Sequence, residues 1–233
     1  MEATTVIEYL EWVQEAQLAT MFRGQGDVEY LLLPSIIRFQ EYVICDFENL
    51  EDLENELLRE FEKYAMPIKD FRALPLVEKL VHAQHYGLPT RLLDWSSNPL
   101  KALYFAVEDQ NLDHKDGSVI AISPYEWYEG TGEIKKIKKI TAFFPELLHE
   151  RLNSQDGCFT AFPLNSSKFE IPELNIDDYP ESIEYMSEIT VPRKWKVNIR
   201  AELNHLGINH RTMYPGMDGV AKWIKSNLSN YKV

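Results

Sequence analysis

Arg23 stands in the segment FRGQGD, residues 22–27, and offers the chemistry of an anion-binding site. Its planar guanidinium carries a fork of donors that matches two oxygens of a pyrophosphate, which lysine does not reproduce. Gly24 would let the backbone approach a ligand closely, and the Gln25 amide could hydrogen-bond a carboxamide. The alternatives are a structural arginine paired with a buried carboxylate and a glutamine that caps a turn.

A second group of polar residues belongs to the segment TRLLDW, residues 90–95, which predicts a strand. Alternation along a strand puts Asp94 and Ser96 on one face and Arg91 on the other. Asp94 and Ser96 therefore predict a polar cleft lining. The alternatives are an aspartate that accepts loop N–H groups and a serine that caps the helix after it.

His85 and Tyr86 precede Gly87, at the turn that leads into this predicted strand. Both are candidates for the same end of the sheet, where Tyr86 could stack on an aromatic ring of a ligand, although packing is the commoner role. His82 and His85 lie three residues apart on a predicted helix, but no cysteine or further histidine stands nearby. We therefore predict no metal site.

Five strings together resemble one domain family, the Phe-Arg-Gly (FRG) domain, over about residues 20–225. They are FRGQGD at 22–27, LLPSIIR at 32–38, HAQHYGLPTRLLDWSSNPLKALYFA at 82–106, RLNSQDGCFTAF at 151–162, and the closing LNHLGINHRTMYPGMDGVAKWI. The family is known mainly as a domain of uncharacterised function in bacteria and phages. The resemblance alone therefore implies no particular reaction.

A more remote resemblance, to the Arg-Ser-Glu class of ADP-ribosyltransferases, implies chemistry. In that class an aromatic-Arg-Gly ends the first core strand, as residues 22–24 would here. A serine-bearing strand then leads into a helix ending in Ala-x-x-Phe-Ala, which Ser96 and the segment 102–106 resemble. The resemblance implies NAD as substrate and an α+β fold with a small mixed or antiparallel sheet flanked by helices.

The third element of that class, a strand starting at a catalytic glutamate, is where this sequence departs from the pattern. Gln155 or Asp156 stands at that place, before the strand CFTAF. The cation that develops when the glycosidic bond breaks needs a nearby carboxylate. Gln155 could hold a ribose hydroxyl without supplying charge, Asp156 could supply charge with a shorter reach, and Asp94 is the spare candidate.

The resemblance implies an NAD-dependent ADP-ribosyltransferase-like toxin or phage-defence effector that modifies a cellular macromolecule, RNA or protein. Such a toxin would require an antitoxin protein. The catalytic candidates are Arg23, Asp94, Ser96, Gln155 and Asp156, and the NAD-binding candidates are Arg23, Gly24, Gln25, His85, Tyr86 and Arg91.

Two other classes of function stay open. One is a non-catalytic module that binds a nucleotide or a protein through the same cleft, which the missing glutamate favours. The other is a nuclease with Asp94, Glu126 or His85 around a metal, which the lack of ligand spacing disfavours. An RNA acceptor would further require the lysine-rich segment 134–140 and several arginines to gather into one basic groove. Those arginines are Arg38, Arg91, Arg151 and Arg211.

The elements that must position these residues follow from periodicity and capping signals. We predict one domain over residues 1–233 and a loop or insertion at about 163–187. Helices are expected at 5–18, over the acidic segment near 46–62, between Pro75 and Gly87, over SSNPLKALYFAVED at 96–109, and at about 195–206 and 217–228. Strands are expected at 20–23, 90–95, 117–123, 158–162 and 188–191, with a lysine-shielded edge element at 134–140.

Charge and composition restrict the partners. Asp and Glu number 37 against 24 Lys and Arg, so the formal net charge is −13, which disfavours general binding to a phosphate backbone. Most of the acidity lies outside the proposed cleft, which leaves a local anion site open. No apolar run approaches the roughly 18 residues of a membrane span, and the two cysteines have no metal-type spacing. We therefore predict a cytoplasmic protein with no membrane partner.

Overall fold

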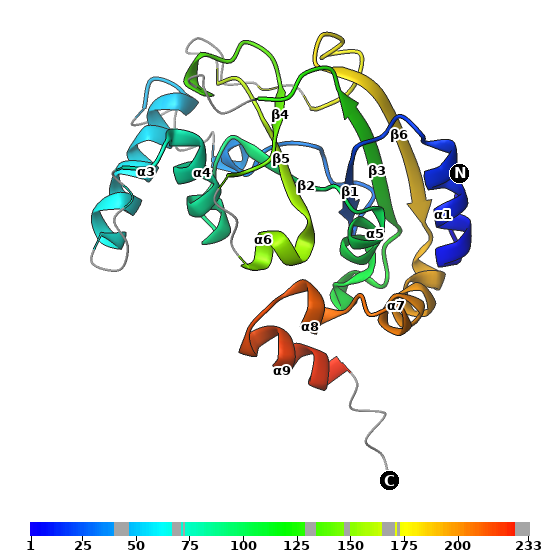
Figure 1. The fold of residues 1–233 in the computed structure, drawn as a ribbon. Helices are drawn as coiled ribbons and strands as arrows, with labels where there is room; N and C mark the ends of the chain where they lie inside the picture. Colours follow the sequence, from blue (N-terminus) through cyan, green and yellow to red (C-terminus); the bar gives the residue numbers. More distant parts are fainter. Residues whose placement is uncertain are drawn as a thin grey trace.

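The computed structural model describes residues 1–39, 47–66, 71, 73–128, 134–146, 150–164, 171 and 173–226. These residues form one antiparallel sheet with helices packed around it, which confirms the α+β class (Figure 1). The strands are β1 (Met21–Gln25), β2 (Leu92–Ser96), β3 (Gly117–Pro124), β4 (Thr141–Phe143), β5 (Gly157–Ala161) and β6 (Ile183–Val191). The α-helices are α1 (Val6–Glu15), α3 (Leu50–Ala65), α4 (Leu76–His85), α5 (Pro99–Val107), α6 (Glu150–Gln155), α7 (Lys196–His205), α8 (His210–Met213) and α9 (Met217–Ser226).

The sheet opens between its two central strands. The strand order is β4-β5-β2-β1-β3-β6. β1 pairs with β3, and β2 with β5, along their whole lengths, but β1 and β2 share a single register pair, Phe22 with Ser96. Beyond that pair the two strands separate. The sheet therefore consists of a β4-β5-β2 half and a β1-β3-β6 half that meet at one point.

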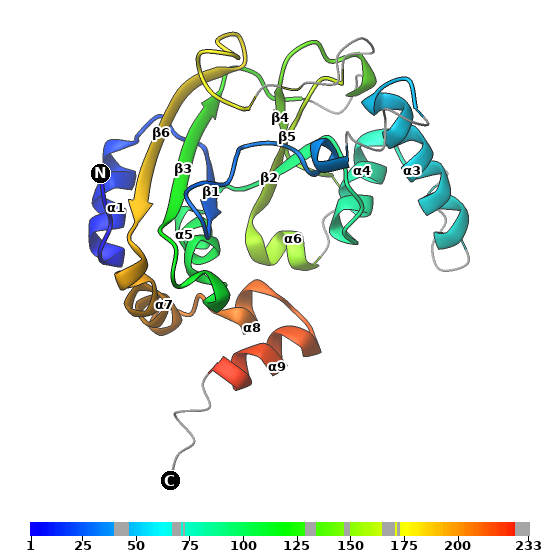
Figure 2. The same ribbon diagram turned by 180° about the vertical axis from the view of Figure 1, so that it is seen from behind.

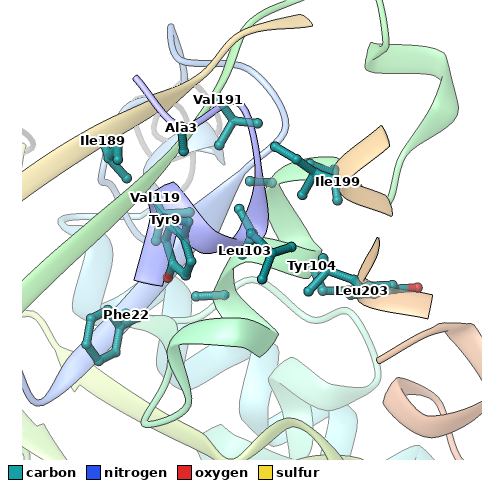
Figure 3. Packing of buried hydrophobic residues seen from close by; sticks show 14 of the residues in the cluster. Ala3, Tyr9, Phe22, Leu103, Tyr104, Val119, Ile189, Val191, Ile199 and Leu203 are labelled. Carbon is teal, nitrogen blue, oxygen red and sulfur yellow. The ribbon is translucent and has the colours of Figure 1, made fainter. Parts of the chain in front are cut away.

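The β1-β3-β6 half is covered by α1, α5 and α7. Their side chains form one buried cluster, in which Tyr9, Leu103 and Leu203 meet Val119 and Ile189 of the sheet (Figure 3). Figure 2 shows α1 running alongside β6. Burial of these apolar side chains fixes the position of α5 against the sheet.

The other half is covered by α3, α4 and α6. Leu58 and Leu80 pack there against Phe143 and Phe159, whose rings stack with centroids 5.4 Å apart. Figure 1 shows α3 and α4 at the opposite end of the sheet from α1 and α7. None of the described helices is long and apolar enough to cross a membrane.

Local signals predicted most of these elements correctly. Asn98 caps α5 by accepting the N–H of Leu100, and Pro99 occupies the first turn. Gly87, with φ of +88°, ends the turn after α4 in the left-handed region. The elements confirmed, with small shifts of their ends, are α1, α3, α4, α5, α7, α9, β1, β2, β3 and β5.

Two predicted segments were wrong in part. Residues 134–140 do not form an edge strand, because their isoleucines recur every third residue, the period of the 3₁₀ turn found at Ile134–Lys136. The edge strand β4 begins after them, at Thr141. The loop predicted at 163–187 includes the start of β6, and residues 165–170 and 172 within it lie outside the described ones. The C-terminal turn also contains α8, a short helix that no pattern indicated.

Glu54 and Arg91 form a buried contact between α3 and the start of β2. Although Glu54 belongs to the acidic segment of α3, its side chain and that of Arg91 are each 1% exposed and form a buried ion pair. Glu54 accepts from Arg91 Nε at 2.7 Å and from the Arg91 backbone N–H at 2.9 Å. Arg91 therefore links α3 to the start of β2, and Glu54 engages its charge. Its part in NAD binding stays a prediction.

Replacing either partner alone should destabilise the fold by about 3–5 kcal/mol, because it leaves a buried charge uncompensated. The double variant Glu54→Leu/Arg91→Met should lose clearly less than the sum of the two single variants. Chemical denaturation of the two single variants and the double variant measures this difference. Additive losses would show that the pair is not energetically coupled.

Candidate active site

A cavity of about 420 Å³ lies where the two halves of the sheet separate. Its walls come from β1, β2 and the start of β5, from the C-terminal ends of α4 and α5, and from α6 and Tyr214. Around it three arginines, Arg23, Arg38 and Arg151, face two carboxylates, Asp94 and Glu108, among the described residues. The volume lies in the usual range for small-molecule sites. The lining is therefore locally cationic in a chain of net charge −13.

Arg23 occupies the point where β1 and β2 separate. Its Nη1 donates to the backbone oxygen of Asp94 at 2.6 Å, across the strands that no longer pair. Its Nε is buried and has no hydrogen-bond partner among the described residues. Burial lowers the pKa of the guanidinium, and the neighbouring charge of Arg38 lowers it further, while Asp94 raises it. The site therefore holds a largely desolvated cation with donor capacity left over.

Gln25 provides an acceptor in the same cavity. Its side chain is 5% exposed, and its Nε2 donates to the Tyr30 backbone oxygen at 3.1 Å. The buried Oε1 has no hydrogen-bond partner within the described parts of the chain. An unpaired buried acceptor costs about 1–3 kcal/mol, so this atom is suited to accept from a ligand.

Gly24 lies where α5 packs against β1. A Cβ at this position would lie 1.8 Å from the backbone oxygen of Ala102 and 2.7 Å from the backbone nitrogen of Ala106. The glycine therefore lets α5 pack directly on β1, and this contact brings the end of α5 to the cavity. Gly24 also lines the cavity, where the approach of a ligand to its backbone stays a prediction.

Asp94, Gln84 and Thr90 form a hydrogen-bonded row at the edge of the cavity. Gln84 Nε2 donates to Asp94 Oδ2 at 2.7 Å, and Thr90 Oγ1 donates to Gln84 Oε1. His85 lines the cavity, where burial, and then the charge of Arg151, lower its pKa. Its imidazole is therefore neutral at pH 7. Tyr86 is 68% exposed and does not line the cavity, and its stacking on a ligand stays a prediction.

The three remaining predicted residues are held by intramolecular bonds. Ser96 Oγ donates to the Gln155 backbone oxygen at 2.7 Å and accepts from the Asn98 N–H at 3.1 Å. It is not the helix cap, a role that Asn98 has. Gln155 lines the cavity, but its Nε2 donates to the Met213 backbone oxygen at 3.1 Å.

Asp156 does not line the cavity. Its Oδ2 forms an ion pair with Lys101 Nζ at 2.6 Å and accepts from Asn98 Nδ2 at 3.0 Å. Its φ of 47° lies in the left-handed region, at the turn from α6 into β5. The segment that should carry the catalytic glutamate therefore presents no carboxylate to the cavity.

Several cavity residues, Arg38, Glu108, Arg151 and Tyr214 among them, have no role in the sequence-based site. Arg38 and Arg151 were considered only for an RNA groove, and Glu108 and Tyr214 were not singled out. Tyr214 belongs to the closing string NHRTMYPG, which was the one available signal. No sequence signal pointed to Glu108, because its position at the cavity depends on where α5 crosses the sheet.

Of the basic residues that an RNA acceptor would require, Arg38 and Arg151 line the cavity, and the others do not. Arg91 is buried against Glu54, while Arg211 lies over the Trp223 ring at 5.1 Å. Lys139 pairs with Glu126 at 2.8 Å, and neither of these two lines the cavity. The described residues contain no group of three His, Cys, Asp or Glu side chains that could hold a metal ion.

Comparison with known proteins identifies one part of the chain. Residues 18–115 match the FRG domain. The chain carries an FRG domain. No curated protein and no solved structure matches the sequence or the fold.

The FRG match includes β1 and β2, two of the three strands that border the cavity, and ends just before β3. Arg23, Gln25, Asp94 and Glu108 lie inside it. The strings at 151–162 and near the C-terminus, through which the resemblance extended to about residue 225, lie outside the match. Residues beyond the FRG match, such as Tyr214, nevertheless complete the wall of the cavity.

Cys158 lines the cavity without being a nucleophile. It is fully buried, and burial, with smaller contributions from Asp94 and Asp156, raises the pKa of its thiol well above the ordinary value.

In a Cys45→Ala variant, Cys158 is the single thiol of the chain. We expect it to react with a disulfide reagent very slowly in native buffer at pH 8 and rapidly in denaturant. Rapid labelling of the native protein would contradict the burial of this thiol.

Proposed function

We propose that this FRG protein is an NAD-dependent ADP-ribosyltransferase-like enzyme that modifies a cellular RNA or protein, acting as a toxin or phage-defence effector. The observation that carries the proposal is the opening of the sheet at Arg23, where a desolvated guanidinium and the unpartnered Oε1 of Gln25 line one cavity. A cation and a buried acceptor in one cavity match a ligand that has both an anionic diphosphate and a carboxamide.

The residues present fit NAD in two respects. Arg23 retains donors for a diphosphate oxygen, and Arg38 is a second guanidinium on the same cavity. Gln25 Oε1 is available to accept from the carboxamide NH₂ of nicotinamide. Bound NAD supplies a ribosyl carbon that carries nicotinamide as leaving group. Arg23 would hold the diphosphate, so that the reacting carbon is fixed relative to the carboxylates of the cavity.

The main alternative is a non-catalytic module that binds a nucleotide or a partner protein through this cavity. One observation favours it, the engagement of both third-element residues, because Gln155 bonds Met213 and Asp156 bonds Lys101. A binding module predicts that replacing Asp94, Gln155 or Asp156 with alanine leaves the cellular effect intact. The enzyme predicts release of nicotinamide from NAD.

Arg23→Ala should lower nicotinamide release by about 100-fold or more, because it removes the cation that holds the diphosphate. Arg23→Lys should recover little of the nicotinamide release, since an ammonium group lacks the planar fork of donors of a guanidinium. Arg59→Ala is the matched control: this arginine is exposed on α3, pairs with Glu56 and does not line the cavity. Nicotinamide release by the purified proteins, with melting temperature as a test of folding, measures the effect.

The same variants distinguish the acceptors in cells. Bacteria expressing wild type should contain protein or RNA that is heavier by one ADP-ribose unit, and those expressing folded Arg23→Ala should not. Mass spectrometry of both fractions identifies which class of macromolecule is modified. Undiminished turnover in Arg23→Ala would refute the proposed function, and binding of NAD without turnover would favour the binding module.

A further inference from the structure

Two carboxylates line the cavity among the described residues, Asp94 and Glu108, and their surroundings differ. Asp94 is exposed and accepts a hydrogen bond from Gln84. Glu108 is partly buried at the C-terminal cap of α5. A carboxylate at a helix C-terminus is disfavoured by the helix dipole, and this one has no ion pair within 4 Å among the described residues. The fold therefore places the Glu108 carboxylate where its charged form is destabilised.

One tyrosine hydroxyl holds the Glu108 carboxylate. The hydroxyl of Tyr214 lies 2.8 Å from Oε1 and 2.7 Å from Oε2. Tyr104, one turn earlier on α5, makes a hydrogen bond of 2.6 Å between its hydroxyl and His210 Nδ1. Two side-chain contacts therefore join the C-terminal part of α5 to α8, the short helix of the C-terminal segment, and to Tyr214 after it.

Burial makes the Glu108 carboxylate a stronger base than an exposed one. Burial raises the pKa of Glu108, which the Tyr214 hydrogen bond and the charges of Lys222 and Arg151 only partly offset. Burial also lowers the pKa of His210, so that its imidazole stays neutral. The titratable or charged groups that face Glu108 are Tyr104 on α5, Arg151 on α6, Tyr214 after α8 and Lys222 on α9, with Arg200 on α7 acting through Tyr104.

We propose that Glu108 is the general base of this site and supplies the carboxylate function that Gln155 and Asp156 do not. This inference rests on the proposed function. The Glu108 carboxylate accepts the proton that an acceptor hydroxyl loses while the acceptor oxygen bonds to the ribosyl carbon, and nicotinamide leaves with the electron pair of the broken bond as a neutral molecule. Tyr214 is a positioning residue, because its hydroxyl holds the carboxylate.

The deciding variant is Glu108→Gln, which keeps the shape of the side chain and removes the base. We expect nicotinamide release to fall by about 100-fold or more while NAD affinity, measured by calorimetry, changes by less than about 3-fold. The acidic limb of the pH–rate profile should disappear with it. Glu150→Gln is the matched control, since Glu150 is exposed at the start of the neighbouring α6 and does not line the 420 Å³ cavity.

A second measurement needs no NAD. Because the folded pKa of Glu108 is raised above the ordinary 4.5, its ionisation opposes folding as pH rises through the folded value. Glu108→Gln should therefore melt at a temperature equal to or above that of wild type at pH 8, and the difference should narrow toward pH 4. A variant that instead becomes less stable than wild type as pH rises would show a structural role.

The outcomes separate the two proposals. Wild-type turnover together with full turnover in Glu108→Gln overturns the role of Glu108 and leaves the proposed function standing. Wild type that neither binds nor cleaves NAD overturns both. If Glu108→Gln does not fold, Tyr214→Phe replaces it: this change should move the acidic limb to higher pH, because the lost hydrogen bond had lowered the pKa of Glu108. An unmoved limb would contradict the proposal.

Discussion

The single register pair between Phe22 and Ser96 is the constraint on which the rest of the site depends. Had β1 and β2 paired along their lengths, as each does with its outer neighbour, the sheet would be continuous and side chains would fill its face. Because they separate, the backbone oxygen of Asp94 loses its central-strand partner, and the guanidinium of Arg23 takes that place. One side chain thus both joins the two halves and carries a charge into the cavity between them.

Close packing transmits this arrangement to the second half of the site. Gly24 admits the backbone of α5 against β1, and the helix then ends at Glu108 beside the cavity. The cation of Arg23 and the carboxylate of Glu108 are consequently set by neighbouring backbone segments rather than by flexible loops. A cavity with three arginines and two carboxylates around it also explains how a chain of net charge −13 can hold a local anion site.

Local sequence signals predicted the helices and strands well, but they could not predict contacts between residues far apart in the chain. The capping residue Asn98 and the left-handed Gly87 defined two helix ends from sequence alone. The alternation that put Arg91 on the face opposite Asp94 agrees with its burial, but its partner Glu54 lies 37 positions earlier, so nothing local indicated the ion pair. Glu108 was missed for the same reason, because its surroundings are created by Tyr214, more than one hundred residues later.

The end of the FRG match at residue 115 has a consequence for work with fragments of the chain. β1 obtains nearly all its backbone hydrogen bonds from β3, and β2 obtains nearly all of its own from β5, and both partners lie outside the match. A fragment cut at the limits of the match would expose two strand edges in place of paired ones. Such a piece is a template for association with other chains, so the unit that folds and the unit defined by sequence similarity differ in this protein.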